Sequence, residues 1–143
     1  MIYEHNLNPV AIEFFSLKIH WYSLAYIFGF IFCNYYSKYL IKQKLLNLEL
    51  SIIDDLITWL IVAVLLGGRL GYVIFYNFDF YFNNPLAILK IWQGGMSFHG
   101  ALIGVIVLII LFSRIKKIKF SQLANLVAYS SPIGIFLGRL ANF

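Results

Sequence analysis

The chain has 143 residues, of which 62% are hydrophobic, 19% are aromatic and only 12% are charged. A soluble domain is about half apolar and about one quarter charged, so this composition excludes an ordinary soluble domain and indicates a helical integral membrane protein. A net charge of +5 would suggest nucleic acid for a soluble protein. In a membrane protein such charges report topology instead, and we expect no nucleic-acid partner.

The first expected membrane span covers about 19–39, after a leader in which a short interfacial helix is expected at about 10–17. A span of about 20 residues at a rise of about 1.5 Å each matches a hydrocarbon core about 30 Å thick. The only cysteine, Cys33, lies inside this span. It provides neither a disulfide framework nor the spacing of metal ligands, so we expect no metal site.

Three further spans are expected at about 52–76, 95–112 and 121–143. The second carries Arg69 and the fourth carries Arg139, with Pro132 as an expected kink. The sequence therefore predicts an all-α polytopic bundle with about four spans in a single transmembrane domain, residues 1–143.

The basic residues are distributed unevenly between the two sides of these spans. Of the 11 Lys and Arg residues, most lie in the linkers that follow the first and third spans. The positive-inside rule places both linkers in the cytoplasm and the N-terminus outside. We therefore expect a multi-pass membrane protein of the inner-membrane type.

This topology brings polar residues of all four spans to one depth. Arg69 and Arg139 lie roughly 22 Å and roughly 27 Å from the cytoplasmic ends of their spans. Tyr22 opens the first span at its outer end, and His99 lies about one turn inside the outer end of the third. Together they predict a polar site in the outer half of the bilayer.

Arginines within a membrane need partners, and no carboxylate is expected at their level. A phospholipid phosphate is the simplest anion there, and Gly94 and Gly95, at an expected helix N-terminus, offer additional N–H donors. Alternatives stay open at three residues. Arg69 can instead bond backbone carbonyls or extend to the interface, Arg139 can extend to the interface, and His99 can be a packed, satisfied histidine.

Glycines recur at four-residue spacing in three spans, a pattern that lets helices pack closely. The pairs are Gly67 and Gly71, Gly100 and Gly104, and Gly134 and Gly138. Each pair adjoins Arg69, His99 or Arg139, so close packing predicts one shared cavity. Asn142 follows Arg139 by three residues on the same helical face.

Four motifs resemble, in order, those of the prolipoprotein diacylglyceryl transferase family. They are His20-Trp-Tyr22, Gly67-Gly-Arg-Leu-Gly-Tyr-Val-Ile-Phe-Tyr-Asn77, Gly94-Gly-Met-Ser-Phe-His-Gly100 and Gly138-Arg-Leu-Ala-Asn-Phe143. The resemblance covers essentially the whole chain. It implies transfer of a diacylglyceryl group from phosphatidylglycerol to the lipobox cysteine thiol near a prolipoprotein signal peptide, the first step of bacterial lipoprotein maturation. It also implies a site open to the outer leaflet and no metal or cofactor.

The resemblance also assigns roles to residues. Arg139 matches the essential phosphatidylglycerol-binding arginine, and His99 matches the histidine that assists thiol deprotonation. Tyr22 and Asn142 match residues important for activity. Further candidates for substrate binding are Arg69, Tyr76, Gly94 and Gly95.

The sequence departs from the family pattern in two respects. Asn125 stands where an Asp is usual, and the chain stops at Phe143 within a motif, so we expect a truncated chain whose activity alone is open.

Two functions of other classes are alternatives. A phospholipid or anion transporter would also use intramembrane arginines, but a transporter is expected to have inverted repeats and helices broken at the membrane midplane. A non-catalytic membrane scaffold would explain the glycines but not Arg69 or Arg139.

Overall fold

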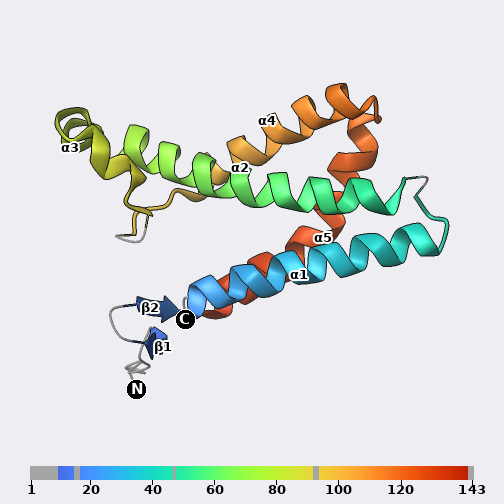
Figure 1. The fold of residues 1–143 in the computed structure, drawn as a ribbon, viewed down its shortest axis with the longest axis horizontal. Coiled ribbons are helices and arrows are strands. Elements are labelled where there is room, and N and C mark those ends of the chain that lie inside the picture. Colours follow the sequence, from blue (N-terminus) through green and yellow to red (C-terminus); the bar gives the residue numbers. More distant parts are fainter. Residues whose placement is uncertain (1–9, 15–16, 47, 92–93, 142–143) are drawn as a thin grey trace, which may run out of the picture. The chain divides into compact units, whose positions relative to one another are not determined.

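The computed structural model describes residues 10–14, 17–46, 48–91 and 94–141, which are mostly helical (Figure 1). The long helices are α1 (Trp21–Lys42), α2 (Leu50–Tyr76), α4 (Phe98–Lys116) and α5 (Phe120–Ala141). The short elements are strands β1 (Val10–Phe14) and β2 (Leu17–His20), helix α3 (Phe78–Asn83) and the 3₁₀ helix η1 (Pro85–Leu89). Each long helix lies where a span was predicted, with ends shifted by a few residues.

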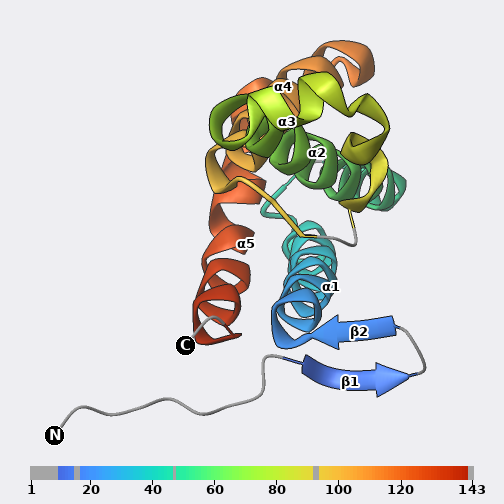
Figure 2. The same ribbon diagram turned by 90° about the vertical axis from the view of Figure 1, so that its left-hand side faces the viewer.

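The short helix expected at about 10–17 is wrong. Strands β1 and β2 form an antiparallel hairpin that precedes α1 (Figure 2). Apolar and polar residues alternate over Ile12–Phe14 and again over Leu17–His20, and alternation with period two favours a strand over a helix. The register places the oppositely charged Glu13 and Lys18 at paired positions.

The chain divides into two compact units. One consists of Met1–Ile53 and Asn125–Phe143, and the other of Asp54–Ala124. The first unit contains the hairpin, α1 and most of α5. The second contains most of α2, together with α3, η1 and α4. Each candidate residue is therefore positioned by the helices of its own unit.

In the second unit, α2 and α4 pack backbone to backbone through their glycines. A Cβ atom added to Gly67 would lie 2.6 Å from the Gly100 carbonyl oxygen, and one added to Gly71 would lie 2.5 Å from the Gly100 Cα. A Cβ on Gly104 would lie 2.5 Å from the carbonyl oxygen of Ala63. Such distances exclude any side chain, so the predicted packing role is confirmed for these two glycine pairs.

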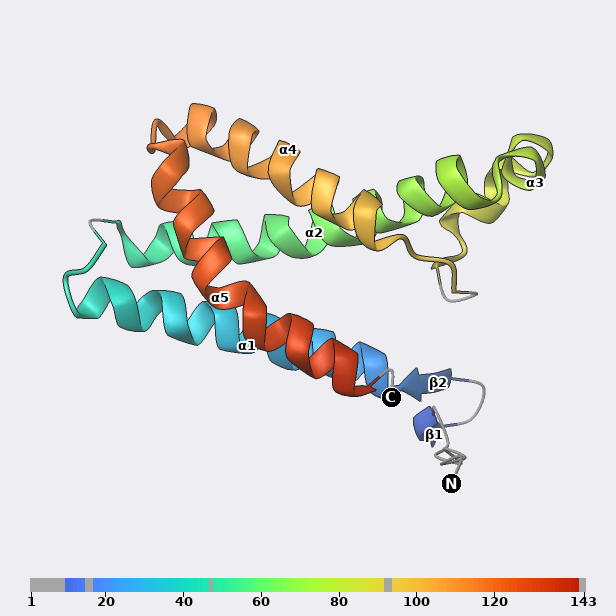
Figure 3. The ribbon, with the colours of Figure 1, turned by 180° about the vertical axis from the view of Figure 1, so that it is seen from behind.

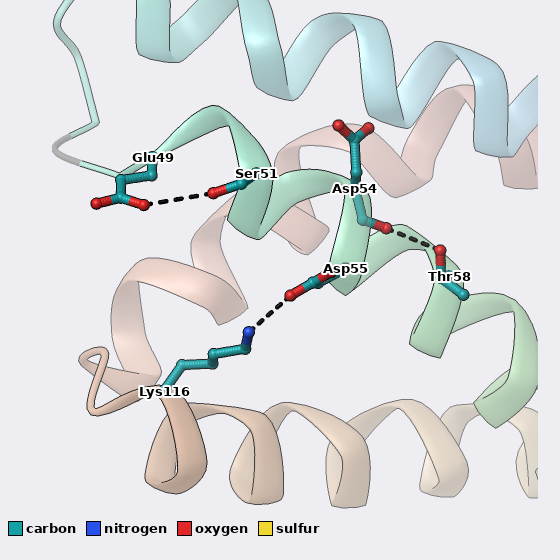
Figure 4. A network of polar contacts seen from close by, with 6 residues as sticks. All are labelled: Glu49, Ser51, Asp54, Asp55, Thr58 and Lys116. Carbon is teal, nitrogen blue, oxygen red and sulfur yellow. Dashed lines mark hydrogen bonds and ion pairs between the residues drawn. The ribbon is translucent and has the colours of Figure 1, made fainter.

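The other end of this helix pair is closed by an ion pair. Lys116 Nζ, near the end of α4, lies 2.6 Å from Asp55 Oδ2, near the start of α2 (Figure 4). On the same turn of α2, the Thr58 hydroxyl donates to the Asp54 carbonyl at 2.9 Å. The two helices are thus antiparallel, with Asp55 and Lys116 at one end and the glycines toward the other.

In the first unit, α1 and α5 lie side by side and antiparallel (Figure 3). A Cβ on Gly29 would lie 3.0 Å from the Gly134 Cα, and one turn further on the Cys33 thiol lies against the Ser130 hydroxyl. By contrast, a Cβ on Gly138 would meet no atom of the described residues within 4 Å. Of the third glycine pair, only Gly134 therefore makes the predicted contact.

Helix α5 continues through Pro132. Proline has no N–H to donate to the carbonyl four residues earlier, which here is that of Ala128. The Ser131 hydroxyl donates to this carbonyl at 3.3 Å, so the carbonyl keeps a partner. The kink expected at Pro132 stays a prediction.

Among the described residues, two helices are long and apolar enough to cross a membrane, namely α2 and α4. This agrees with the second and third predicted spans. The crossing of the membrane by α1 and α5, and the outside position of the N-terminus, remain predictions.

The glycine packing predicts a selective effect of Gly67→Ala. The added methyl would collide with the Gly100 carbonyl, and overpacking of this kind typically costs about 1–3 kcal/mol. Gly138→Ala is the matched control, because it brings the same gain in helix propensity without a collision. Thermal unfolding of the reconstituted chain measures both, and equal melting temperatures would contradict the packing.

Candidate functional site

Arg69 lies inside α2 with only 3% of its surface exposed, and its guanidinium is bound by backbone carbonyls. Nε donates to Ile88 O at 2.9 Å, Nη2 donates to Ala87 O at 2.8 Å and Lys90 O at 3.1 Å, and Nη1 donates to Gly95 O at 3.1 Å and to Gly94 O. A guanidinium has five N–H groups, and all five are used. Of the alternatives left open by the sequence, the structure shows the carbonyl-bonded arginine.

One aromatic ring lies over this cation, and two others pack against that ring in series. The Arg69 guanidinium carbon lies 5.1 Å from the ring centroid of Tyr81, a buried residue of α3. This distance lies within the range of a cation–π contact. The Tyr81 ring meets that of Tyr72 edge-on at 6.4 Å, and Tyr72 stacks on Tyr76 at 5.7 Å. Tyr76, the last residue of α2, is itself exposed.

Gly94 and Gly95 both have φ of +82°, a region that side chains avoid. Gly95 is also crowded, since an added Cβ would lie 2.5 Å from the Tyr72 ring and 3.0 Å from Arg69 Nη1. The expectation that these glycines begin the third helix is wrong, because α4 starts at Phe98. Their carbonyls face Arg69, and the Gly94 N–H donates to Ile91 O at 3.2 Å.

The first turn of α4 is tied to α2. The N–H of Ser97, a residue 3% exposed, donates to Gly68 O at 2.8 Å, and its hydroxyl accepts from the Gly100 N–H at 3.2 Å as the helix cap. His99, two residues on, is exposed and meets the Phe98 ring edge-on at 5.9 Å. Its exposure within this unit does not fit a buried packing histidine.

Five of the candidate residues therefore lie at one end of the α2–α4 pair. They are Arg69, Tyr76, Gly94, Gly95 and His99. The ion pair of Asp55 with Lys116 lies at the opposite end. The separation of the two ends is roughly 20 Å, from 14 residues of α2 at its helical rise.

Two more candidates lie at one end of the α1–α5 pair. Tyr22 precedes Gly29 by about two turns, and Arg139 follows Gly134 by less than two turns. Because Gly29 contacts Gly134 and the helices are antiparallel, Tyr22 and Arg139 fall at the same end. Arg139 is exposed. Asn142 lies outside the described residues, and the convergence of Arg139 with His99 stays a prediction.

Sequence reasoning missed four contributors. Ser97 directly precedes an apolar run, which is a signal for a helix cap. Ala25 and Ser37, both buried, continue the spacing of Gly29 and Cys33 at four-residue intervals and could have been found from that spacing. Tyr81 has no sequence signal, because its contact with Arg69 depends on the turn between α2 and α3.

A tightly packed apolar helix pair that carries a buried, carbonyl-bound cation and an exposed histidine at one end defines a class. Such an arrangement is typical of a helical membrane protein with a polar site at one end of its helices. Within the described ranges, no three His, Cys, Asp or Glu side chains are grouped to hold a metal ion.

Comparison with known proteins specifies the family. The family described as prolipoprotein diacylglyceryl transferase matches residues 9–143, and the chain belongs to it. The chain is 47% identical over 137 residues to the phosphatidylglycerol–prolipoprotein diacylglyceryl transferase of Ehrlichia canis, covering 96% of the chain and 52% of that protein. It is 46% identical over 143 residues to that of Neisseria gonorrhoeae, covering 100% of the chain and 50% of the relative. The chain thus spans about half the length of these relatives.

The two glycines before α4 provide a matched pair of variants. Gly94→Ala and Gly95→Ala carry the same strain at φ of +82°, but only the second methyl meets Tyr72 and Arg69. We expect Gly95→Ala to lower the free energy of unfolding by about 1–3 kcal/mol more than Gly94→Ala. Chemical denaturation in detergent micelles measures both, and equal losses would show that the crowding around Gly95 is unimportant.

Proposed function

We propose that this chain carries part of the active site of a phosphatidylglycerol–prolipoprotein diacylglyceryl transferase. The observation that supports this most strongly is the match of relatives with that name over 96–100% of the chain. The proposed substrates are phosphatidylglycerol and a prolipoprotein whose lipobox cysteine follows its signal peptide. The proposed location is a bacterial inner membrane, with four spans, the N-terminus outside and the site open to the outer leaflet.

In the proposed reaction, the cysteine sulfur attacks the terminal carbon of the diacylglyceryl group. A C–S bond forms, the C–O bond to phosphate breaks, and its electron pair stays on the phosphate oxygen of the leaving glycerol phosphate. The thiol gives up its proton in the process. Since a free thiol has a pKa of about 8.5, a nearby base raises the reactive thiolate fraction at neutral pH.

His99 is the proposed residue that assists loss of the thiol proton. Its exposure in the first turn of α4 supports this role, because a substrate thiol can reach an exposed ring. The ring is also free of the tight packing that surrounds Ser97 and Gly100. The final acceptor of the proton stays open between His99 and the leaving phosphate.

Arg139 is the proposed ligand of the phosphatidylglycerol phosphate. Its guanidinium is exposed at the end of α5, and a bidentate fork there would stabilise the charge that grows on the leaving phosphate. Tyr22 shares this end of the helix pair and is proposed to contact substrate. Asn142 follows by three residues, and Tyr76 extends an exposed ring from α2.

The proposed topology puts the Asp55 and Lys116 end of the α2–α4 pair in the cytoplasm. Basic residues gather at this end, with Arg114 and Lys116 in the last turn of α4 and Lys117 at its cap. The opposite end, with His99, would then face the outer leaflet. The agreement between the charge bias and the antiparallel pairing supports this orientation.

Activity can be tested in a chimera in which residues 1–143 replace the aligned half of the Neisseria gonorrhoeae relative. We expect transfer of labelled diacylglycerol from phosphatidylglycerol to a lipobox peptide. Arg139→Ala and His99→Gln should each lower the rate about 100-fold or more, the scale of a lost oxyanion ligand or general base. Arg114→Ala, at the other end of α4, is the control and should keep the rate.

Two outcomes would contradict the proposal. One is a chimera that inserts into membranes and folds but transfers nothing. The other is full turnover in the Arg139→Ala variant.

A further inference from the structure

We propose that Arg69 is a positioning residue that fixes the first turn of α4, and with it His99, and that it does not bind the lipid phosphate. The role of His99 in this inference rests on the proposed function. The placement of the loop and the helix end rests on the contacts of Arg69 alone.

The first step is the saturation of the guanidinium. All five N–H groups of Arg69 donate to carbonyl oxygens, and the side chain is 3% exposed. A phosphate bound through two N–H groups would have to displace at least two of these carbonyls from a guanidinium that the protein covers almost completely. Each displaced carbonyl would lose a hydrogen bond to a charged donor, which is stronger than one to a neutral donor, so the arrangement opposes phosphate binding at this residue.

The second step is that this one side chain binds two separate stretches of backbone. Its acceptors lie in two stretches of the loop between α3 and α4, namely 87–90 and 94–95. A lysine cannot replace it, because an ammonium has three donors rather than a planar set of five. The positive φ of Gly95 and the Tyr72 ring behind it leave the Gly95 carbonyl little freedom to turn away.

The third step connects the loop to His99. Two residues after Gly95, the Ser97 N–H donates to Gly68 O, the carbonyl of the residue before Arg69 in α2. The Ser97 hydroxyl then caps α4 at Gly100, whose backbone touches Gly67 and Gly71. His99 lies between these two anchored residues, so its backbone position depends on the loop that Arg69 holds.

Tyr81 completes the arrangement from α3. Its buried ring lies over the guanidinium and keeps water from the cation. The guanidinium of Arg69, which belongs to α2, is thus in contact with both helix α3 and the loop before α4. Its loss should loosen the loop and the first turn of α4, while the rest of the helix pair, from Gly104 toward the ion pair of Asp55 with Lys116, stays formed.

The test is amide hydrogen exchange of the 143-residue chain in lipid nanodiscs. In Arg69→Lys and Arg69→Gln we expect exchange in the 87–101 region to be about tenfold faster or more. Exchange in the middle of α4, about 103–113, should stay unchanged and shows that each variant is folded. Arg114→Lys, an exposed arginine in the last turn of α4, is the matched control and should change neither region.

If both Arg69 variants fail to fold, Tyr81→Leu gives a milder test. It removes the ring over the cation but keeps every carbonyl partner, so a two- to fivefold increase in exchange is expected at 87–95. Unchanged exchange in the folded Arg69 variants, or in Tyr81→Leu if those do not fold, would overturn the inference.

The membrane composition distinguishes a positioning role of Arg69 from a lipid-binding role. For a positioning residue, exchange at 87–95 in the unmodified chain should be equal in phosphatidylglycerol and phosphatidylcholine nanodiscs. Protection that appears only with phosphatidylglycerol and is lost in Arg69→Lys would make Arg69 a lipid ligand and overturn the inference.

Kinetic measurements on the chimera test this inference separately from the proposed function. Arg69→Lys should lower kcat with little change in the KM for phosphatidylglycerol, whereas Arg139→Lys should raise that KM. A raised KM in Arg69→Lys with kcat kept would contradict positioning. An inactive parent chimera would count against the proposed function and leave the exchange result standing.

Discussion

A positive charge buried between apolar helices has to be satisfied inside the protein, and the second unit is built around that constraint. The guanidinium of Arg69 replaces its water shell with five carbonyl oxygens and an aromatic ring. Carbonyl oxygens can stabilise the buried charge without a carboxylate, because a guanidinium spreads its charge over five donors. The loop before α4 takes its path from this requirement.

Close glycine packing makes the arrangement possible. The carbonyls of the loop reach Arg69 only because α2 and α4 approach until their backbones touch at Gly67, Gly71 and Gly100. The α1–α5 pair uses the same device at Gly29 and Gly134. Without a hydrophobic force between helices in lipid, such contacts and the interhelical hydrogen bond from Ser97 to Gly68 provide the attraction. The polar site is thus built at the end of a rigid helix pair.

The sequence predicted the regular parts of this protein. Long apolar stretches located the four helices, since a span requires about 20 apolar residues and leaves few alternatives. The spacing of Gly67 with Gly71 and of Gly100 with Gly104 predicted close helix packing, which the structure shows between α2 and α4. The N-terminal hairpin was missed because alternation is confined to two short stretches, Ile12–Phe14 and Leu17–His20, and is interrupted by a Phe-Phe pair.

The partners of Arg69 were beyond reach of the sequence. The sequence offers no side-chain anion at the level of Arg69. Every residue carries a backbone carbonyl, and the path of the loop decides which carbonyls reach the guanidinium. The helical start expected at Gly95 failed for a related reason, because positive φ at both glycines delays α4 until Ser97 caps it. Family resemblance named Arg139 and His99 as functional, and both are exposed.

The central proposal is that the first turn of α4, which carries His99, and the last turn of α5, which carries Arg139, each take part in recognising phosphatidylglycerol. Photoactivatable phosphatidylglycerol, crosslinked to the reconstituted chain and mapped by mass spectrometry, tests this most directly. Labelling should concentrate at the first turn of α4 and the last turn of α5, and excess phosphatidylglycerol but not phosphatidylcholine should compete. Labelling spread evenly along the helices, or concentrated near Asp55 and Lys116, would contradict the claim.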